Sequence, residues 1–366
     1  MTKTPAFAYR RIVVKIGSNV LTRADGTLDT TRMSALTDQV AVLTRSGVEV
    51  ILVSSGAVAA GRSEVSPAPH HLDAVAARQL FSAVGQGKLI GKYYELFREH
   101  GIVCGQVLTT KESFATRGHY LNQRNCMAVM LESAVVPIVN ENDTISVTEL
   151  MFTDNDELSG LVAAMMDAEA LIILSNIDGI YDGDPADASS KVISRIRPQG
   201  VDLSRYVRSS RSQFGRGGMI TKSRIASKVA QEGIEVIIAN GKRENILCDL
   251  VSGSPDVVCT RFLPSEKSKS AIKRWISHSE GFAKGEIHVN QGAYQALVGQ
   301  RAVSLLPVGV ECIRGDFEKD DIVRIIAPDG RQIGVGRVST GSAQAQRQIG
   351  RKGARALVHY DYLYLD

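Results

Sequence analysis

The sequence predicts an α/β protein in which helices sandwich a mostly parallel sheet, followed by a small β-rich domain. The first two-thirds of the chain alternates continuous Val, Ile and Leu runs with longer helical patterns. Continuous apolar runs are typical of parallel strands buried on both faces, and their alternation with helices favours crossover connections. From residue 281 the apolar residues recur at every second position between frequent glycine turns, which indicates a small, mainly β domain. A length of 366 residues also exceeds the usual size of one domain.

The elements of the first part are expected in strict alternation along the chain. Strands are expected at residues 11–16, 49–53, 102–108, 135–139, 170–174 and 236–239. Helices are expected at residues 30–46, 74–99, 122–132, 156–166 and 221–232. In sheets of this kind ligands bind outside the carboxyl ends of the strands, so polar residues at those ends are the candidates for function.

The character of the sequence changes near residue 262, where a polar and basic stretch begins. We therefore predict a first domain over residues 1–262, a linker over 263–280 and a second domain over 281–366. The second domain is expected to contain one helix, near residues 293–298. Its clearest strand patterns are at residues 286–289, 322–326 and 333–336.

Composition excludes several classes of protein. The five cysteines are scattered and form neither a CxxC pair nor a cluster with zinc spacing, so no structural zinc is expected and a reducing compartment is indicated. The N-terminus lacks the apolar core of a signal peptide, and no apolar run reaches membrane-spanning length. A cytoplasmic protein without a membrane partner is the expectation.

Two lysines lie in settings suited to phosphate. Lys15 closes the first strand and is followed by a Gly-Ser-Asn turn, where glycine lets backbone amides approach an anion. The segment Arg216–Lys222 places a Gly-Gly pair just before a helix, whose first amides point toward an anion. No Walker A motif is present. Taken alone, Lys15 is equally compatible with an edge lysine, and the Gly-Gly segment with a capped loop.

Amides mixed with carboxylates follow the later strands. They form the blocks Asn140–Asp143 and Asp154–Glu157, and a Ser-Ser-Gly-Ala turn at residues 54–57 ends the second strand. Such groups are costly to desolvate, and they suit a pocket for an ammonium group or a hydrated cation. Asn and Asp are also common turn formers, but two blocks so close together make turn chemistry alone a weaker explanation.

These motifs, in this order, resemble the glutamate 5-kinase branch of the amino-acid kinase family over residues 10–260. The tail resembles the PUA domain that many bacterial members carry. The motifs that carry the resemblance are Val14–Ser18, Val53–Gly61, Val139–Asp143, Asp154–Asp156, Ile177–Tyr181 with Asp184 and Pro185, and Gly217–Lys222.

The resemblance implies an enzyme that uses ATP and Mg²⁺ to phosphorylate the side-chain carboxylate of L-glutamate, giving L-glutamyl 5-phosphate as the first step of proline biosynthesis. It implies that Lys15 and Lys222 stabilise the transferring phosphoryl group and that Asp156 holds both lysines. The residues implied to bind glutamate are Ser55, Gly56, Asn140, Asp143 and Asn155. Those implied to line the nucleotide site are Lys15, Ser175, Asn176, Arg216, Gly217, Gly218, Met219, Ile220, Thr221 and Lys222. No protein metal site is implied.

The expected chemistry agrees with the absence of an obvious catalytic His or Cys. A carboxylate is already nucleophilic near neutral pH and needs no general base. The difficulty is that an anion must attack a triphosphate, so positioning and charge neutralisation should dominate. Asp143 suits the substrate ammonium. Asn19, Asn176 and Arg216 depart from the family pattern, and the last two put nucleotide preference in question.

Two alternatives remain open from the sequence. The first keeps the fold but changes the acceptor to acetylglutamate, aspartate or a nucleoside monophosphate. The second is RNA binding through the tail, where 16 Lys and Arg stand against 11 Asp and Glu from residue 261 onward. A merely solvated basic surface explains that excess more simply. The resemblance further implies a homo-oligomer, feedback inhibition by proline and a partnership with glutamyl phosphate reductase.

Overall fold

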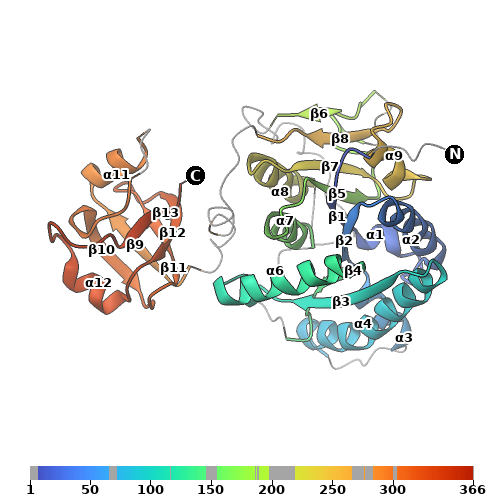
Figure 1. Ribbon diagram of the computed structural model, residues 1–366, viewed down its shortest axis with the longest axis horizontal. Coiled ribbons are helices and arrows are strands. Elements are labelled where there is room, and N and C mark those ends of the chain that lie inside the picture. The colour runs from blue at the N-terminus through green and yellow to red at the C-terminus, as the bar shows by residue number, and fades with distance from the viewer. Residues whose placement is uncertain are drawn as a thin grey trace. The chain divides into compact units, whose positions relative to one another are not determined.

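The computed structural model describes residues 7–65, 72–115, 117–145, 155–185, 187, 189–197, 219–265, 276, 283–299 and 303–365. The chain divides into two compact units (Figure 1). One unit comprises residues 1–110 and 124–268, and the other comprises residues 111–123 and 269–366. The predicted linker over residues 263–280 lies mostly outside the described residues, so the domain boundaries stay a prediction.

The first unit is built on an eight-stranded sheet in the order β3-β4-β2-β1-β5-β7-β8-β6. The six strands from β3 to β7 pair in parallel, β8 pairs antiparallel with β7, and β6 pairs parallel with β8. The predicted mostly parallel sheet is therefore confirmed. The strands are β1 (Arg11–Ile16), β2 (Glu49–Ser54), β3 (Val103–Thr109), β4 (Val135–Glu141), β5 (Ala170–Ser175), β6 (Arg195–Ile196), β7 (Glu235–Asn240) and β8 (Cys259–Phe262).

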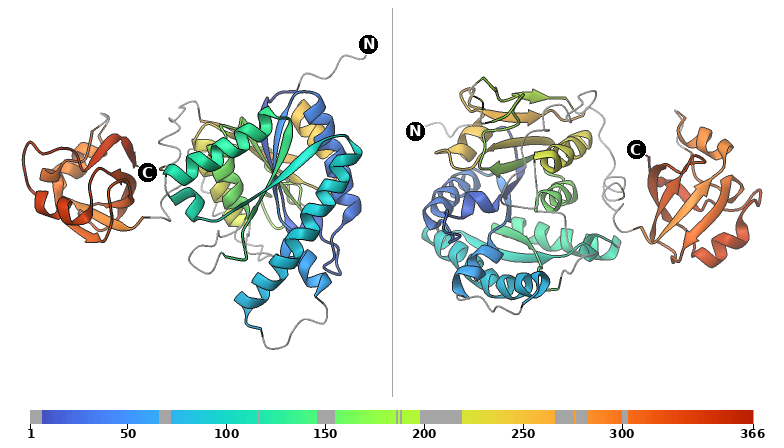
Figure 2. Two further views of the ribbon diagram at one scale, coloured as in Figure 1. Left: turned by 60° about the horizontal axis from the view of Figure 1, so that its bottom comes forward. Right: turned by 180° about the vertical axis from the view of Figure 1, so that it is seen from behind.

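Helices cover both faces of this sheet (Figures 1 and 2). Alternate residues of β1, namely Ile12, Val14 and Ile16, pack in one core with α2, α4 and α9. Helices α7 and α8 pack together, and α7 also contacts β1. The helices of this part of the chain are α1 (Ser18–Leu21), α2 (Thr30–Arg45), α3 (Ala57–Glu64), α4 (Ala74–Glu99), α5 (Glu112–Ala115), α6 (Arg117–Glu132), α7 (Asn155–Met165), α8 (Met219–Gln231) and α9 (Ile246–Ser252). Of these, α5 and residues 117–123 of α6 are assigned to the second unit.

Helices α3 and α4 approach each other closely because glycines lie at their contact. A Cβ atom on Gly85 would lie 1.7 Å from the carbonyl oxygen of Ala57, and one on Gly61 would lie 1.8 Å from that of Phe81. Only glycine lacks that atom, so the two backbones can touch. The N-terminus of α4 is fixed by Asp73, whose side chain accepts a hydrogen bond from the amide of Ala76 at 2.7 Å. This packing anchors the first turns of α4 beside the carboxyl ends of the strands.

The second unit contains a five-stranded sheet in the order β10-β9-β11-β12-β13, in which only the β9–β11 pair is parallel. Its core includes Ile287, Val323 and Val358, all fully buried. The strands are β9 (Gly285–Val289), β10 (Val310–Gly315), β11 (Ile322–Ile326), β12 (Gln332–Val338) and β13 (Val358–Leu365). The other elements are α11 (Gln291–Leu297), the 3₁₀ turn η4 (Pro307–Gly309) and α12 (Ser342–Gln348).

The prediction of a single helix in the second unit is wrong, because α12 is a second one. Its sequence, SAQAQRQ, has no apolar periodicity, and Ala345 is its one buried residue. A helix with so small an apolar face gives no signal to a pattern-based prediction. In the part of the chain that the structure describes, no helix combines the length and apolarity needed to cross a bilayer.

Candidate active site

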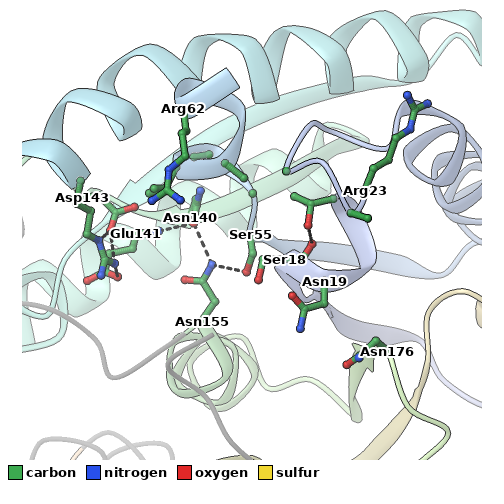
Figure 3. Close-up of a pocket in the computed structure, with 18 of the residues that line it drawn as sticks. Ser18, Asn19, Arg23, Ser55, Arg62, Asn140, Glu141, Asp143, Asn155 and Asn176 are labelled. Carbon is green, nitrogen blue, oxygen red and sulfur yellow. Dashed lines mark hydrogen bonds and ion pairs between the residues drawn. The ribbon is translucent and has the colours of Figure 1, made fainter. Parts of the chain in front are cut away.

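The candidate site lies at the carboxyl ends of the parallel strands of the first unit, where a cavity of about 800 Å³ opens (Figure 3). Asp143 and Glu141 lie at one side of the cavity and Asn176 at the other, with Ser55 and Asn155 between them (Figure 3). The polar and charged residues that line it are Ser18, Asn19, Thr22, Arg23, Ser55, Arg62, Arg78, Asn140, Glu141, Asp143, Asn155, Asn176 and Lys242.

The two predicted lysines, Lys15 and Lys222, both form ion pairs with Asp156 in a buried cluster. Asp156, in the first turn of α7, is fully buried. Its Oδ1 lies 2.5 Å from Nζ of Lys15 on β1, and its Oδ2 lies 2.9 Å from Nζ of Lys222 in the first turn of α8. Burial would raise the pKa of Asp156, but the two ammonium groups outweigh it and hold the pKa below its ordinary value. The cluster carries a net charge of +1 and offers two ammonium groups on one fixed carboxylate.

Gly17 differs from its predicted role in one respect. Its amide donates a hydrogen bond to the carbonyl oxygen of Leu174 at 3.1 Å, so it is not available to an anion. A Cβ atom at this position would lie 3.1 Å from that same oxygen and 3.5 Å from Nζ of Lys15. The glycine therefore leaves room for the Lys15 ammonium group beside β5.

Asn155 connects the strand ends on the other side of β1. Its Nδ2 donates to Oγ of Ser55 at 2.9 Å and to Oδ1 of Asn140 at 3.1 Å (Figure 3). Gly56 follows with a φ of 105°, a left-handed conformation that side chains disfavour, and it caps α3. The predicted acceptor residues Ser55, Gly56, Asn140 and Asn155 are thus side by side at the cavity wall.

The acidic side of the cavity holds a residue that was not predicted. Arg78, in the second turn of α4, donates to Oδ1 of Asp143 through Nε at 2.8 Å and Nη2 at 2.5 Å. The same Nη2 donates to Glu141 at 3.2 Å. Both carboxylates are nearly fully buried. Asp143, predicted to be the counter-charge of an ammonium group, is therefore already ion-paired with a guanidinium.

Among the predicted nucleotide residues that the structure describes, Asn176 is the one that lines the cavity. Ser175 ends β5, and its Oγ accepts a hydrogen bond from the amide of Ile177 at 3.2 Å. Asn176 is exposed and lines the cavity. Residues 219–222 form the first turn of α8. Arg216, Gly217 and Gly218 lie outside the described residues.

A surface ion pair follows β5 and β7. The Asp178 carboxylate accepts from Nε of Arg243 at 2.7 Å and from Nη2 at 2.8 Å, and Asn240 also donates to it at 3.1 Å. These contacts hold the pKa of Asp178 below its ordinary value, with the Arg243 hydrogen bonds as the main cause. The loop after β5 is thereby tied to the loop after β7.

The described part of the chain offers no dedicated metal site. No three His, Cys, Asp or Glu side chains converge there in a way that could hold an ion. The one buried carboxylate near the lysines, Asp156, is already engaged by two ammonium groups.

Known proteins resemble the whole chain. Residues 10–240 match the amino acid kinase family, and residues 285–360 match the PUA domain. A protein of Bacteroides thetaiotaomicron named glutamate 5-kinase is 66% identical, over 98% of this chain and 99% of the relative. A glutamate 5-kinase of Chlorobaculum tepidum is 49% identical, over 98% of both chains.

Among solved structures, carbamate kinase from Giardia lamblia bound to AMP-PNP aligns with a TM-score of 0.51 at 17% identity. The alignment covers 70% of this chain and 99% of that structure. At so low an identity the likeness concerns the fold alone.

Proposed function

We propose that this chain, which belongs to the amino acid kinase family, transfers the γ-phosphoryl group of ATP to the side-chain carboxylate of L-glutamate. The products are L-glutamyl 5-phosphate and ADP, and the reaction is the first step of proline biosynthesis. The observation that carries the proposal is the 66% and 49% identity to proteins named glutamate 5-kinase over almost the entire chain. The polar cavity beside the Lys15–Asp156–Lys222 cluster is compatible with that reaction.

In the proposed reaction an oxygen of the glutamate side-chain carboxylate attacks the γ-phosphorus. A new P–O bond forms while the bond to the β,γ-bridging oxygen breaks, and the electron pair of that bond leaves with ADP. No proton is transferred, because the nucleophile is already ionised. The chain supplies charge neutralisation instead: Lys15 and Lys222 face the transferring group, and Asp156 fixes both ammonium groups in place.

The acceptor is proposed to lie along the cavity, from the wall formed by Ser55, Asn140 and Asn155 to the side that holds Glu141 and Asp143. Ser55, Asn140 and Asn155 form a hydrogen-bonded set at the strand ends, suited to hold and orient the acceptor. The substrate ammonium belongs at Asp143, which is the acidic end of the same cavity. The nucleotide belongs on the other side, at Ser175, Asn176 and the first turn of α8. Arg216, Gly217 and Gly218, which lie outside the described residues, are proposed to contribute to the same nucleotide site.

Magnesium is proposed to accompany ATP and to reduce the charge of its phosphates. The described residues offer no cage for it, so no step of the reaction is assigned to a protein–metal bond. A homo-oligomer, feedback inhibition by proline, a glutamyl phosphate reductase partner and a cytoplasmic location are further proposals that rest on the resemblance. RNA binding by the PUA unit is not favoured, because the relatives that match over the full length are named as kinases.

The test is the release of ADP with L-glutamate, ATP and Mg²⁺, with the acyl phosphate trapped by hydroxylamine as its hydroxamate. N-acetylglutamate, aspartate and UMP serve as competing acceptors in parallel reactions. Equal amounts of ADP and hydroxamate that require glutamate are expected. Turnover with another acceptor but not with glutamate would overturn the proposed substrate while leaving the family unchanged.

A further inference from the structure

Arg78 has unused hydrogen-bonding capacity inside the cavity. Its Nε and Nη2 are engaged by Asp143 and Glu141, whereas its Nη1 makes no hydrogen bond to any residue that the structure describes. The Arg78 side chain is 23% exposed, against 7% for Asp143 and 3% for Glu141. Arg78 also lines the cavity. A planar guanidinium held along one edge by a carboxylate offers its remaining N–H groups in a fixed direction.

The acidic residues on this side of the cavity indicate what the free N–H groups of Arg78 would bind. Asp143 and Glu141 bring two carboxylates to this side of the cavity, which suits the arrival of an ammonium group. In a free α-amino acid a carboxylate is bonded to the same carbon atom as the ammonium group. The two buried acids would repel this carboxylate unless a cation bound it. Among the residues that bound this acidic side, Arg78 is the cation in direct contact with both acids.

We propose that Arg78 binds the α-carboxylate of the acceptor through Nη1 while its other edge keeps Asp143 oriented toward the acceptor's ammonium group. This inference rests on the proposed function and adds how the site recognises a free α-amino acid. The ion pair does not have to break when the substrate arrives. Arg78 therefore sets acceptor specificity: it favours an acceptor with an anionic α-substituent over the same molecule with a neutral one.

Arg62 is the competing candidate for this role. It also lines the cavity, but its guanidinium lies over the Phe81 ring, 5.5 Å from the ring centroid. No carboxylate contact of Arg62 is described in the structure, so nothing there fixes its direction as Asp143 fixes that of Arg78. Both arginines are therefore replaced in the test, and the outcome decides between them.

The test compares L-glutamate with L-isoglutamine, which keeps the ammonium group and side-chain carboxylate but carries a neutral α-amide. The variants are Arg78→Gln, Arg78→Lys and Arg62→Gln. Lys88→Gln is the matched control, since Lys88 lies on the same helix and pairs with Glu64 at the surface. Turnover is measured for glutamate, and isoglutamine is measured as a substrate and as a competitive inhibitor.

We expect Arg78→Gln to lower kcat/KM for glutamate by roughly 10- to 100-fold, the value of one charge-assisted hydrogen bond. The change should appear mainly in KM, because the contact is present both before and during the reaction. Isoglutamine binding should weaken by a smaller factor, because that ligand loses only the orientation of Asp143 and not a contact to its α-substituent, so the preference for glutamate should fall. Arg78→Lys should restore part of that preference, and Lys88→Gln should leave it intact.

Three outcomes would overturn the inference. An equal loss for both ligands would mean that Arg78 only orients Asp143, and no loss for either ligand would mean that Arg78 contacts neither. Loss of the preference in Arg62→Gln alone would assign the role to Arg62. Ligand-induced shifts in Tm are recorded for every variant, because binding stabilises the folded chain even when turnover is lost. Wild-type protein that neither turns over glutamate nor gains Tm from it would instead refute the proposed function.

Discussion

Replacement of Asp156 by Asn tests how far the buried charge cluster determines both stability and turnover. The change removes the one negative charge between two ammonium groups whose side chains are only 6% and 13% exposed. Loss of one partner from a buried ion pair costs about 3–5 kcal/mol, because the remaining charge stays desolvated. Folded domains have only about 5–15 kcal/mol in total. Asp156→Asn should therefore bring the first unit close to its stability limit.

The assay is urea unfolding followed by circular dichroism, together with turnover of glutamate. With an m-value of about 2–3 kcal/mol/M, a loss of 3–5 kcal/mol lowers the midpoint by about 1–2 M. Turnover of the folded fraction should fall by roughly 100-fold or more, because neither lysine is fixed. Asp167→Asn is the matched control, since its pair with Arg124 is half-exposed and worth at most about 1 kcal/mol.

A double variant distinguishes misfolding of Asp156→Asn from a loss of lysine positioning. Lys222→Met added to Asp156→Asn removes one of the two ammonium groups that have lost the Asp156 carboxylate, so part of the lost stability should return while turnover stays low. Asp156→Asn as stable and as active as Asp167→Asn would refute the reasoning about the cluster. A large loss of stability with normal kcat would show that Asp156 supports the fold but does not position the lysines.

Three further predictions concern neighbouring features. Lys222→Met should lower kcat by about 100-fold, whereas Arg224→Gln, exposed on the same helix, should not; similar kcat values in both would contradict the role of the lysine. Gly85→Ala should destabilise by about 1–3 kcal/mol or more in urea, because its Cβ would lie 1.7 Å from a backbone oxygen of α3. Gly87→Ala, with open space around it, should stabilise by about 0.5–1 kcal/mol, and the reverse order would refute the packing argument. The pKa of Asp156 lies below its ordinary value of 3.8, so its stabilising effect is complete above that pH and is lost on acidification through the folded-state pKa. The stability of Asp156→Asn should accordingly fall less steeply than that of wild type in acid urea titrations.

The order of strands and helices in the first unit was predictable because each element carries a strong local pattern. The strand Arg11–Ile16 is apolar at every position except Arg11 and Lys15, and all but its first residue are buried in the structure. The helix that begins near Asp156 follows the polar block just as expected. The two strands that lie beyond β7 in the sheet gave weaker signals: β6 has two residues and β8 four, too short for a period to be recognised.

The charge cluster was not deducible from local patterns. Lys15, Asp156 and Lys222 are far apart in the sequence, and spacing alone does not indicate that they meet. Their common role came from the family resemblance, and the structure adds the distances between them. Arg78 was missed because nothing around it differs from an ordinary helical arginine. Glu141 stands inside a block that was recognised, but its pairing with a distant helix was not visible.

The position of β1 between β2 and β5 has a consequence for how new specificities could arise in this fold. The proposed acceptor residues lie at the ends of β2 and β4 and at the start of α7, whereas most of the proposed nucleotide residues lie at the end of β5 and at the start of α8. Lys15, on β1, borders both groups. Because the chain builds one half of the sheet mainly from residues before 142 and the other mainly from residues after 169, a recombination event between the halves would exchange one recognition surface and spare the other. Recombination could therefore change the specificity for the acceptor without changing the specificity for the phosphoryl donor, or the reverse. Every recombinant would have to keep β1, because Lys15 borders both groups of residues.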